Sequence, residues 1–356
     1  MSSISNADTI NKEKKDKLFE LDYMRFIACL AVMIVHITAT AMDTNGYIRG
    51  SLPYVVILAV NRSFKFTTPI FIFLSGVTSF YSYRKKEFKY FPFIVRRLEK
   101  VLVAYLVWCA VYYAAYIKLG YYSFDIRFFI DRILLGDMSY HLYFVIIITQ
   151  MYIIGPVFYK MLKGSDRKIT ILIVAAIITA LCAEYIRFKY SDRLFLKYMF
   201  FYMLGIFVTL EYDKYISWIN KNKFAISAGY VIISAVYAMV SYYDHVTYIY
   251  VWFVFSIFSV FFVYYIGLLM KKSLSKLYSF IKLFGQSSYY IYLMHPLVLT
   301  LMIMYTNNNG ILSVTKRLII YFSTVIPITV AACLAFTALR NKIKKNKKAA
   351  LTASSN

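Results

Sequence analysis

Two ionisable side chains share one face of an apolar segment near the start of the chain. Arg25 and His36 stand eleven residues apart in the run LDYMRFIACLAVMIVH. Eleven residues of α-helix turn through about 1100°, within roughly 20° of three full turns, so both side chains project from one face about 16 Å apart. A neutral imidazole takes a proton from a hydroxyl near pH 7, and a guanidinium binds an anion. Asp22 lies one turn before Arg25, where it can pair with the guanidinium.

Other apolar runs also carry ionisable residues, although inserting such a charge into hydrocarbon costs roughly 2.5–3.5 kcal/mol. Those in the outer half or the middle of their runs are Arg62, Lys65, His141, Glu184 and His295. Together they predict an electropositive cavity that receives an anionic group or steadies a developing oxyanion. The structural alternative stays open: Arg25 snorkels to the headgroups, a lone His such as His36 or His295 forms a packing hydrogen bond, and residues near the membrane surface are solvated.

Long apolar helices are needed to position these residues. The 356 residues are 61% hydrophobic and only 16% charged, which is too apolar for an ordinary soluble domain. Runs of about twenty apolar residues, the length that crosses roughly 30 Å of hydrocarbon, recur along the chain. We predict an all-α integral membrane bundle of about ten transmembrane helices, at residues 21–42, 54–81, 98–117, 140–159, 169–186, 195–210, 224–241, 248–269, 283–306 and 318–339. The segment 124–136 predicts a further short helix in the membrane interface.

Lysine and arginine are unevenly divided between the loops. Alternate segments, beginning with the N-terminal tail and ending with the C-terminal tail, carry 27 of these residues, whereas the intervening loops carry 10. The positive-inside rule therefore predicts that both termini are cytoplasmic. The same placement attributes the net charge of +24 to topology and lipid headgroups rather than to nucleic acid. We divide the chain into a polar N-tail (1–20), a transmembrane domain (21–340) and a Lys-rich C-tail (341–356).

The four cysteines offer no metal site or disulfide framework, because they fall singly in separate apolar runs. Composition and spacing alone thus leave two classes open, a transporter and an intramembrane enzyme. The broken, inverted halves of many transporters are not visible in the sequence.

Five segments, in chain order, resemble the acyltransferase family 3 membrane proteins. The first is the run that holds Arg25 and His36 at the family's spacing of ten intervening residues. The others are NRSFKFTTPIFIFLSG (61–76), FIVRRLEKVLVAY (93–105), SYHLYFVIIITQMYIIGPVF (139–158) and SSYYIYLMHPLV (287–298). Together they span nearly the whole chain. It is most similar to the stand-alone branch that acylates surface polysaccharides, which includes the acyltransferase of the intercellular-adhesion polysaccharide operons.

The resemblance implies a reaction and its partners. Such proteins transfer an acyl group, usually acetyl and sometimes succinyl, from cytoplasmic acyl-CoA to a hydroxyl of a cell-surface or lipid-linked glycan. We therefore expect acetyl-CoA or succinyl-CoA as a donor substrate and no permanently bound cofactor. The expected partners are the carbohydrate acceptor, the lipid bilayer and other proteins of polysaccharide synthesis. The expected location is the bacterial cytoplasmic membrane, crossed several times.

The resemblance also implies roles for individual residues. His36 would be the general base, and Asp22 would orient Arg25. The groups that would grip the CoA phosphates are Arg25, Arg96, Arg97 and, less firmly, Lys100. The substrate-binding or supporting residues would be Arg62, as a charge where donor and acceptor meet, together with His141 and Tyr143. His295 would support the site structurally.

Two of these positions depart from the family pattern. Lys100 stands where the family has a third Arg, and a lysine supplies charge without a bidentate fork. Tyr143 replaces a Trp, which alters the acceptor pocket. Two rival functions remain: a glycan exporter or flippase, and a non-catalytic scaffold for a polysaccharide synthase. An exporter leaves its glycan unmodified and does not need acyl-CoA.

Overall fold

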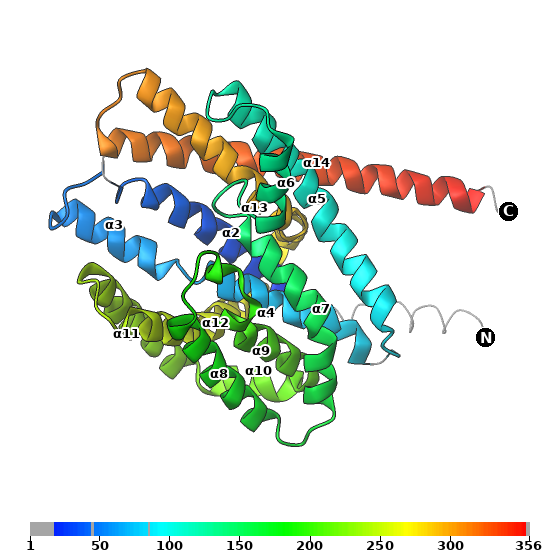
Figure 1. Ribbon diagram of the computed structural model, residues 1–356. Coiled ribbons are helices and arrows are strands. Elements are labelled where there is room, and N and C mark those ends of the chain that lie inside the picture. The colour runs from blue at the N-terminus through cyan, green and yellow to red at the C-terminus, as the bar shows by residue number, and fades with distance from the viewer. Residues whose placement is uncertain (1–17, 44–45, 85, 354–356) are drawn as a thin grey trace.

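The described residues, 18–43, 46–84 and 86–353, form helices joined by loops, with no strand among them, in this computed structural model (Figure 1). The α-helices are α2 (Glu20–Ala39), α3 (Leu52–Ser63), α4 (Thr67–Phe80), α5 (Tyr90–Lys118), α6 (Ile126–Leu135), α7 (Tyr143–Lys163), α8 (Lys168–Tyr185), α9 (Met199–Leu210), α10 (Tyr212–Lys221), α11 (Lys223–Tyr242), α12 (Tyr248–Ser273), α13 (Tyr278–Asn308) and α14 (Val314–Ala353). Short 3-10 turns are η1 (Tyr81–Arg84), η2 (Ser191–Arg193), η3 (Phe195–Lys197) and η4 (Ser275–Leu277).

Nine stretches of the described chain are long and apolar enough to cross a membrane, which confirms the predicted helical membrane bundle. The sixth predicted span, 195–210, is shorter than expected. It forms η3 and the twelve-residue α9, whose rise of about 18 Å falls short of a hydrocarbon core of about 30 Å. The cytoplasmic placement of both termini stays a prediction.

The short helix α9 lies in the middle of the bundle and packs against α4, α7 and α8. Its backbone touches that of α4 directly. A Cβ added to Gly205 would lie 2.3 Å from the carbonyl oxygen of Phe73, and one added to Gly76 would lie 2.3 Å from that of Tyr202. Small residues of this kind allow helices in lipid to approach closely enough for backbone contact. The two glycines therefore set the distance between α4 and α9.

Replacing Gly205 by Leu should force α4 and α9 apart, because no flexible side chain is available to yield. Overpacking of this kind costs about 1–3 kcal/mol, so we expect the thermal unfolding midpoint in detergent to fall by about 1–4 °C. Ala110→Leu, which adds the same bulk on an exposed face of α5, serves as the control. Equal midpoints for the two variants would contradict the close contact.

The predicted second span, 54–81, is interrupted in its middle. Helix α3 ends at Ser63, and α4 begins at Thr67. Pro69 explains the break, because proline has no N–H to bond the carbonyl four residues earlier, and its ring crowds that carbonyl, which belongs to Lys65. The unwound residues 64–66 thus lie where a continuous helix was expected. Irregular backbone at membrane depth is tolerated where it lines a cavity.

Two carboxylates fasten the start of α2. Asp22 accepts hydrogen bonds from Arg25 (2.8 Å) and from the Tyr278 hydroxyl on α13 (3.0 Å). The pairing of Asp22 with Arg25 predicted from the sequence is therefore present. Glu20 is fully buried and accepts hydrogen bonds from Tyr212, Tyr264 and Lys271. The helix that carries His36 is thus tied at its other end to α10, α12 and α13.

Three further elements bear on the sequence predictions. The short helix expected at 124–136 is present as α6, capped by Asp125 and ended by left-handed Gly136; its position in the interface stays a prediction. Helix α10 lies in a segment taken for a loop, although its buried Tyr215 and Ile219 are spaced one helical turn apart. Helix α14 continues through the Lys-rich tail to Ala353 and projects beyond the bundle (Figure 1). Residues 1–17 and 354–356 of the predicted tails lie outside the described residues.

Candidate active site

Three of the four histidines meet near the end of α2. The ring centroid of His36 lies 5.2 Å from that of His295 on α13, which lies 5.8 Å from that of His141 in the turn before α7. The fourth, His245, is exposed in the loop before α12. His141 and His295 are buried, whereas His36 is half-buried. The sequence predicted these histidines as separate members of a cavity, and the fold makes them one cluster.

In each of the two buried histidines, one ring nitrogen lies within hydrogen-bond distance of a protein oxygen, and the other has no partner among the described residues. His295 Nδ1 lies 2.9 Å from the carbonyl oxygen of Ile291. Because a carbonyl only accepts, Nδ1 carries the proton, and Nε2 of the neutral ring keeps its lone pair. His141 Nδ1 lies 3.2 Å from the Ser139 hydroxyl. The Nε2 atoms of both rings are buried and have no partner in the part of the chain described, which is typical of a site that awaits a ligand or water.

His36 itself forms no hydrogen bond with any described residue, and it lines a cavity of about 320 Å³. That volume is at the lower end of the range of roughly 300–1,000 Å³ usual for small-molecule sites. The polar side chains around the cavity are those of His36, Lys65, Thr67, Thr68, His141, Tyr143, Asp192, Lys197, Tyr198, Tyr248 and Tyr292. Two lysines face one aspartate, so the cavity is electropositive, in agreement with the prediction from the sequence.

The interrupted helix supplies one of the two cations of the cavity. Lys65 lies in the break between α3 and α4 and lines the cavity. Arg62, the supporting charge expected from the sequence, has a different contact. Its Nη1 donates to the Asn61 side chain (2.7 Å), and the Asn61 amide donates to the carbonyl oxygen of Val35 (2.9 Å). Arg62 therefore supports the packing of α3 on α2 beside His36, while Lys65 reaches the cavity.

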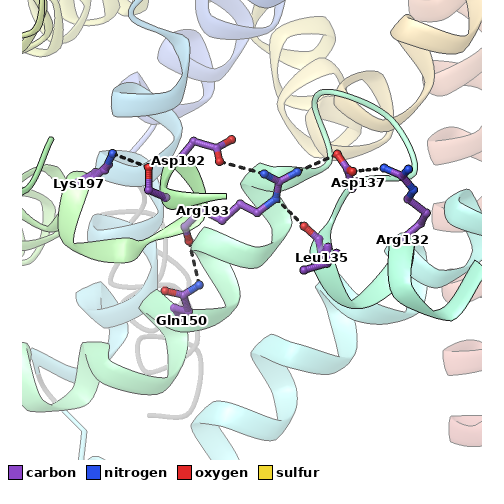
Figure 2. A network of polar contacts seen from close by, with 8 residues as sticks. Arg132, Leu135, Asp137, Gln150, Asp192, Arg193 and Lys197 are labelled. Carbon is purple, nitrogen blue, oxygen red and sulfur yellow. Dashed lines mark hydrogen bonds and ion pairs between the residues drawn. The ribbon is translucent and has the colours of Figure 1, made fainter. Parts of the chain in front are cut away.

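The loop between α8 and α9 provides Asp192, Lys197 and Tyr198 to the cavity wall, and a network of charges holds it (Figure 2). Asp137, which precedes α7, accepts hydrogen bonds from both Arg132 and Arg193. Arg193 also bonds the carbonyl oxygen of Leu135 (2.5 Å) and Asp192 (2.9 Å). On the other side of the loop, the Gln150 amide donates to the carbonyl oxygen of Arg193 (2.9 Å) and accepts from the Phe195 N–H (3.1 Å). The loop is thus fixed from two sides.

Asp137→Asn should release this loop, because it removes the negative charge that two arginines share and replaces one of their acceptor oxygens by an amide nitrogen. A partly exposed ion pair contributes about 1 kcal/mol at most, so we expect about fivefold faster trypsin cleavage after Lys189 in the purified protein. Asp244→Asn, which breaks an exposed pair with Arg49 elsewhere, is the control and should leave that rate unchanged. Unchanged cleavage in Asp137→Asn would show that the backbone contacts to Gln150 hold the loop without the ion pairs.

The residues expected to bind the donor do not form one cluster. Arg25 lies on α2 at the end opposite His36 and pairs with Asp22. Arg97 donates to the carbonyl oxygen of Thr78 on α4 (2.6 Å), whereas Arg96 donates to the Tyr83 hydroxyl in η1 (3.0 Å). Lys100 lines a separate groove against α14. Arg96, Arg97 and Lys100 of α5 therefore lie at three different places in the fold.

Several cavity residues were missed by the sequence reasoning. Tyr143 was predicted and lines the cavity, where its hydroxyl lies 3.2 Å from that of Thr68. Asp192, Tyr248 and Trp252 also line it, but nothing in their sequence context singles them out. Each stands in or beside a loop between spans, and its approach to His36 depends on how distant helices pack.

The comparison with known families decides the class of the protein. Residues 18–338 match the acyltransferase domain of acyltransferase family 3. The chain belongs to this family. The match covers all of the clustered histidines, both cavity lysines and every basic residue expected to bind the donor.

Named relatives are consistent with this membership. The chain is 24% identical over 316 residues to a probable poly-beta-1,6-N-acetyl-D-glucosamine export protein of Staphylococcus aureus strain MSSA476, covering 83% of this chain and 85% of the relative. The protein of the same name from Staphylococcus epidermidis is 25% identical, with 83% and 84% covered. A Bacillus subtilis protein named as a membrane-bound acyltransferase is 20% identical over 63% of this chain and 65% of its own length. No solved structure matches the chain significantly.

Proposed function

We propose that this protein moves an acyl group from acyl-CoA to a hydroxyl of a cell-surface or lipid-linked glycan, in the bacterial cytoplasmic membrane. The observation that supports this most is the half-buried His36 at an electropositive cavity, in a chain of acyltransferase family 3. His36 has no hydrogen bond to a described residue, so its ring is free to meet a hydroxyl. Names of the relatives that mention a polysaccharide favour a glycan as the acceptor.

The proposed reaction is a single transfer from sulfur to oxygen. His36 takes the proton of the acceptor hydroxyl while the hydroxyl oxygen attacks the thioester carbonyl carbon. The Lys65 ammonium group and the Tyr143 hydroxyl stabilise the resulting oxyanion. When the carbon–sulfur bond breaks, the CoA sulfur leaves with the proton held by the imidazolium. His295, whose ring packs against His36, offers a neighbouring Nε2 acceptor that steadies the charged ring.

The donor would come from the other end of α2. Arg25 and Arg97 are half-buried at the end of the bundle where lysine and arginine are in excess, which the positive-inside rule assigns to the cytoplasm. Guanidinium groups bind phosphate oxygens in a bidentate fashion. In this proposal they hold the CoA phosphates, with acetyl or succinyl as the group transferred, while the glycan enters from the outer side beside Asp192 and Lys197.

His36→Ala should abolish transfer, because it removes the base. Membranes with the wild-type chain are supplied with acetyl-CoA or succinyl-CoA labelled in the acyl group, and label in the host glycans is counted. We expect incorporation to fall by at least about 100-fold, the usual contribution of a general base. His245→Ala removes the one histidine outside the cluster and should retain full activity. Normal incorporation by a well-expressed His36→Ala protein would refute the assignment.

The same assay distinguishes the roles of Lys65 and Arg62. Lys65→Gln should lower kcat about 10- to 1,000-fold, because a charged group near the oxyanion is lost. Arg62→Gln should have a much smaller effect, since Arg62 contacts Asn61 and does not line the cavity. The reverse order of effects would restore Arg62 as the supporting charge.

Glycan export without covalent chemistry is the second candidate, favoured by the printed names of the staphylococcal relatives. An exporter would move unmodified glycan across the membrane with no acyl donor. Export that persists in His36→Ala cells, together with no acyl label in any wild-type glycan, would support this candidate over the transferase.

A further inference from the structure

A lateral groove of about 680 Å³ runs between α5 and α14 and shares no lining residue with the cavity beside His36. Helix α13 forms its floor. The Tyr289 hydroxyl of α13 bonds the carbonyl oxygen of Val101 on α5 (2.9 Å), and the Ser287 hydroxyl bonds Thr337 on α14 (2.8 Å). The groove therefore has walls fixed on both sides by hydrogen bonds to one central helix.

The groove is basic at one end and apolar along the rest. Its charged lining residues are Glu99, Lys100, Arg340 and Lys344, three cations against one anion. Arg340 donates to the Tyr290 hydroxyl (2.6 Å), which holds its guanidinium at the floor of the groove. Lys100 and Lys344 have no ion-pair partner among the described residues. The apolar walls are formed by Val103, Ala104, Val107, Trp108, Val111, Met294, Ala332, Cys333 and Phe336.

The dimensions match one leaflet of a bilayer. From Lys100 to Val111 the wall of α5 rises about 16 Å, roughly half of a 30 Å hydrocarbon core. On α14, Arg340 and Lys344 stand one turn apart at the basic end, and Ala332 lies three turns from Lys344 at the apolar end. The basic end belongs to the side that carries the excess of lysine and arginine. An anionic headgroup there and acyl chains along the wall would match the groove in charge, polarity and length.

We propose that this groove binds one anionic phospholipid, with its phosphate held by Lys100, Arg340 and Lys344. A phosphate on a soluble nucleotide carries the same charge, but the ribose and base would have to cover apolar walls such as Val103 and Val107, each 57% exposed. We therefore assign a lipid, and not a nucleotide, to this groove. Lys100, expected from the family pattern to contact the donor, serves the lipid in this proposal, which is independent of the transfer reaction.

The test uses the full chain in detergent and counts retained phosphatidylglycerol and phosphatidylcholine by native mass spectrometry. The triple variant Lys100→Gln, Arg340→Gln, Lys344→Gln should bind phosphatidylglycerol at least tenfold more weakly, because each cation near an anionic lipid contributes roughly fivefold in affinity before salt screening. The control Lys160→Gln, Lys221→Gln, Lys276→Gln removes the same charge from exposed sites outside the groove and should bind like the wild type.

A second variant tests the apolar wall without changing any charge. Ala332→Trp fills the apolar end of the groove and should also weaken phosphatidylglycerol retention at least tenfold, whereas a phosphate ligand without acyl chains would be unaffected. If the triple variant does not purify, Lys344→Gln alone should weaken retention roughly fivefold. Three outcomes would each overturn the proposal. They are equal phosphatidylglycerol retention by the two triple variants, equal retention of phosphatidylcholine and phosphatidylglycerol by the wild type, and displacement of the lipid by acetyl-CoA.

Discussion

A charge in hydrocarbon is expensive unless it meets a partner or a wet cavity, and this constraint organises the molecule. At one end of α2, Asp22 and Glu20 are neutralised by Arg25 and Lys271 and hydrogen-bonded by tyrosines. At the other end, His36 and Lys65 are instead left at a cavity. The paired groups fasten the helix, whereas His36 and Lys65 line the cavity.

The cavity exists because two helices are incomplete. Pro69 ends the helical ladder before α4, so Lys65 and the threonines that follow it reach the space beside His36. Helix α9 is too short to fill its path across the bundle, and the turns η2 and η3 before it close the cavity with Asp192 and Lys197. The direct contact between Gly76 on α4 and Gly205 on α9 holds these two short helices together.

Arg193 shows how the loop between α8 and α9 is held in place although it contains only short 3-10 turns. Its guanidinium contacts Asp137, Asp192 and a carbonyl oxygen, while its own carbonyl oxygen is held by Gln150. Several shared hydrogen bonds position a loop more firmly than one exposed ion pair does. Asp192 and Lys197 can therefore form part of the cavity wall although they belong to no α-helix.

The sequence by itself determined the membrane class, nearly all of the spans and the pairing of Asp22 with Arg25, because hydrophobic runs and helical spacing are local properties. It also indicated an electropositive cavity, since buried charges must gather around polar space. Only the tertiary structure decided that His36, His141 and His295 form one cluster, that Lys65 rather than Arg62 reaches the cavity, and that Lys100 lies in a groove apart from Arg97. Those relations join segments up to 260 residues apart, and helix packing sets them.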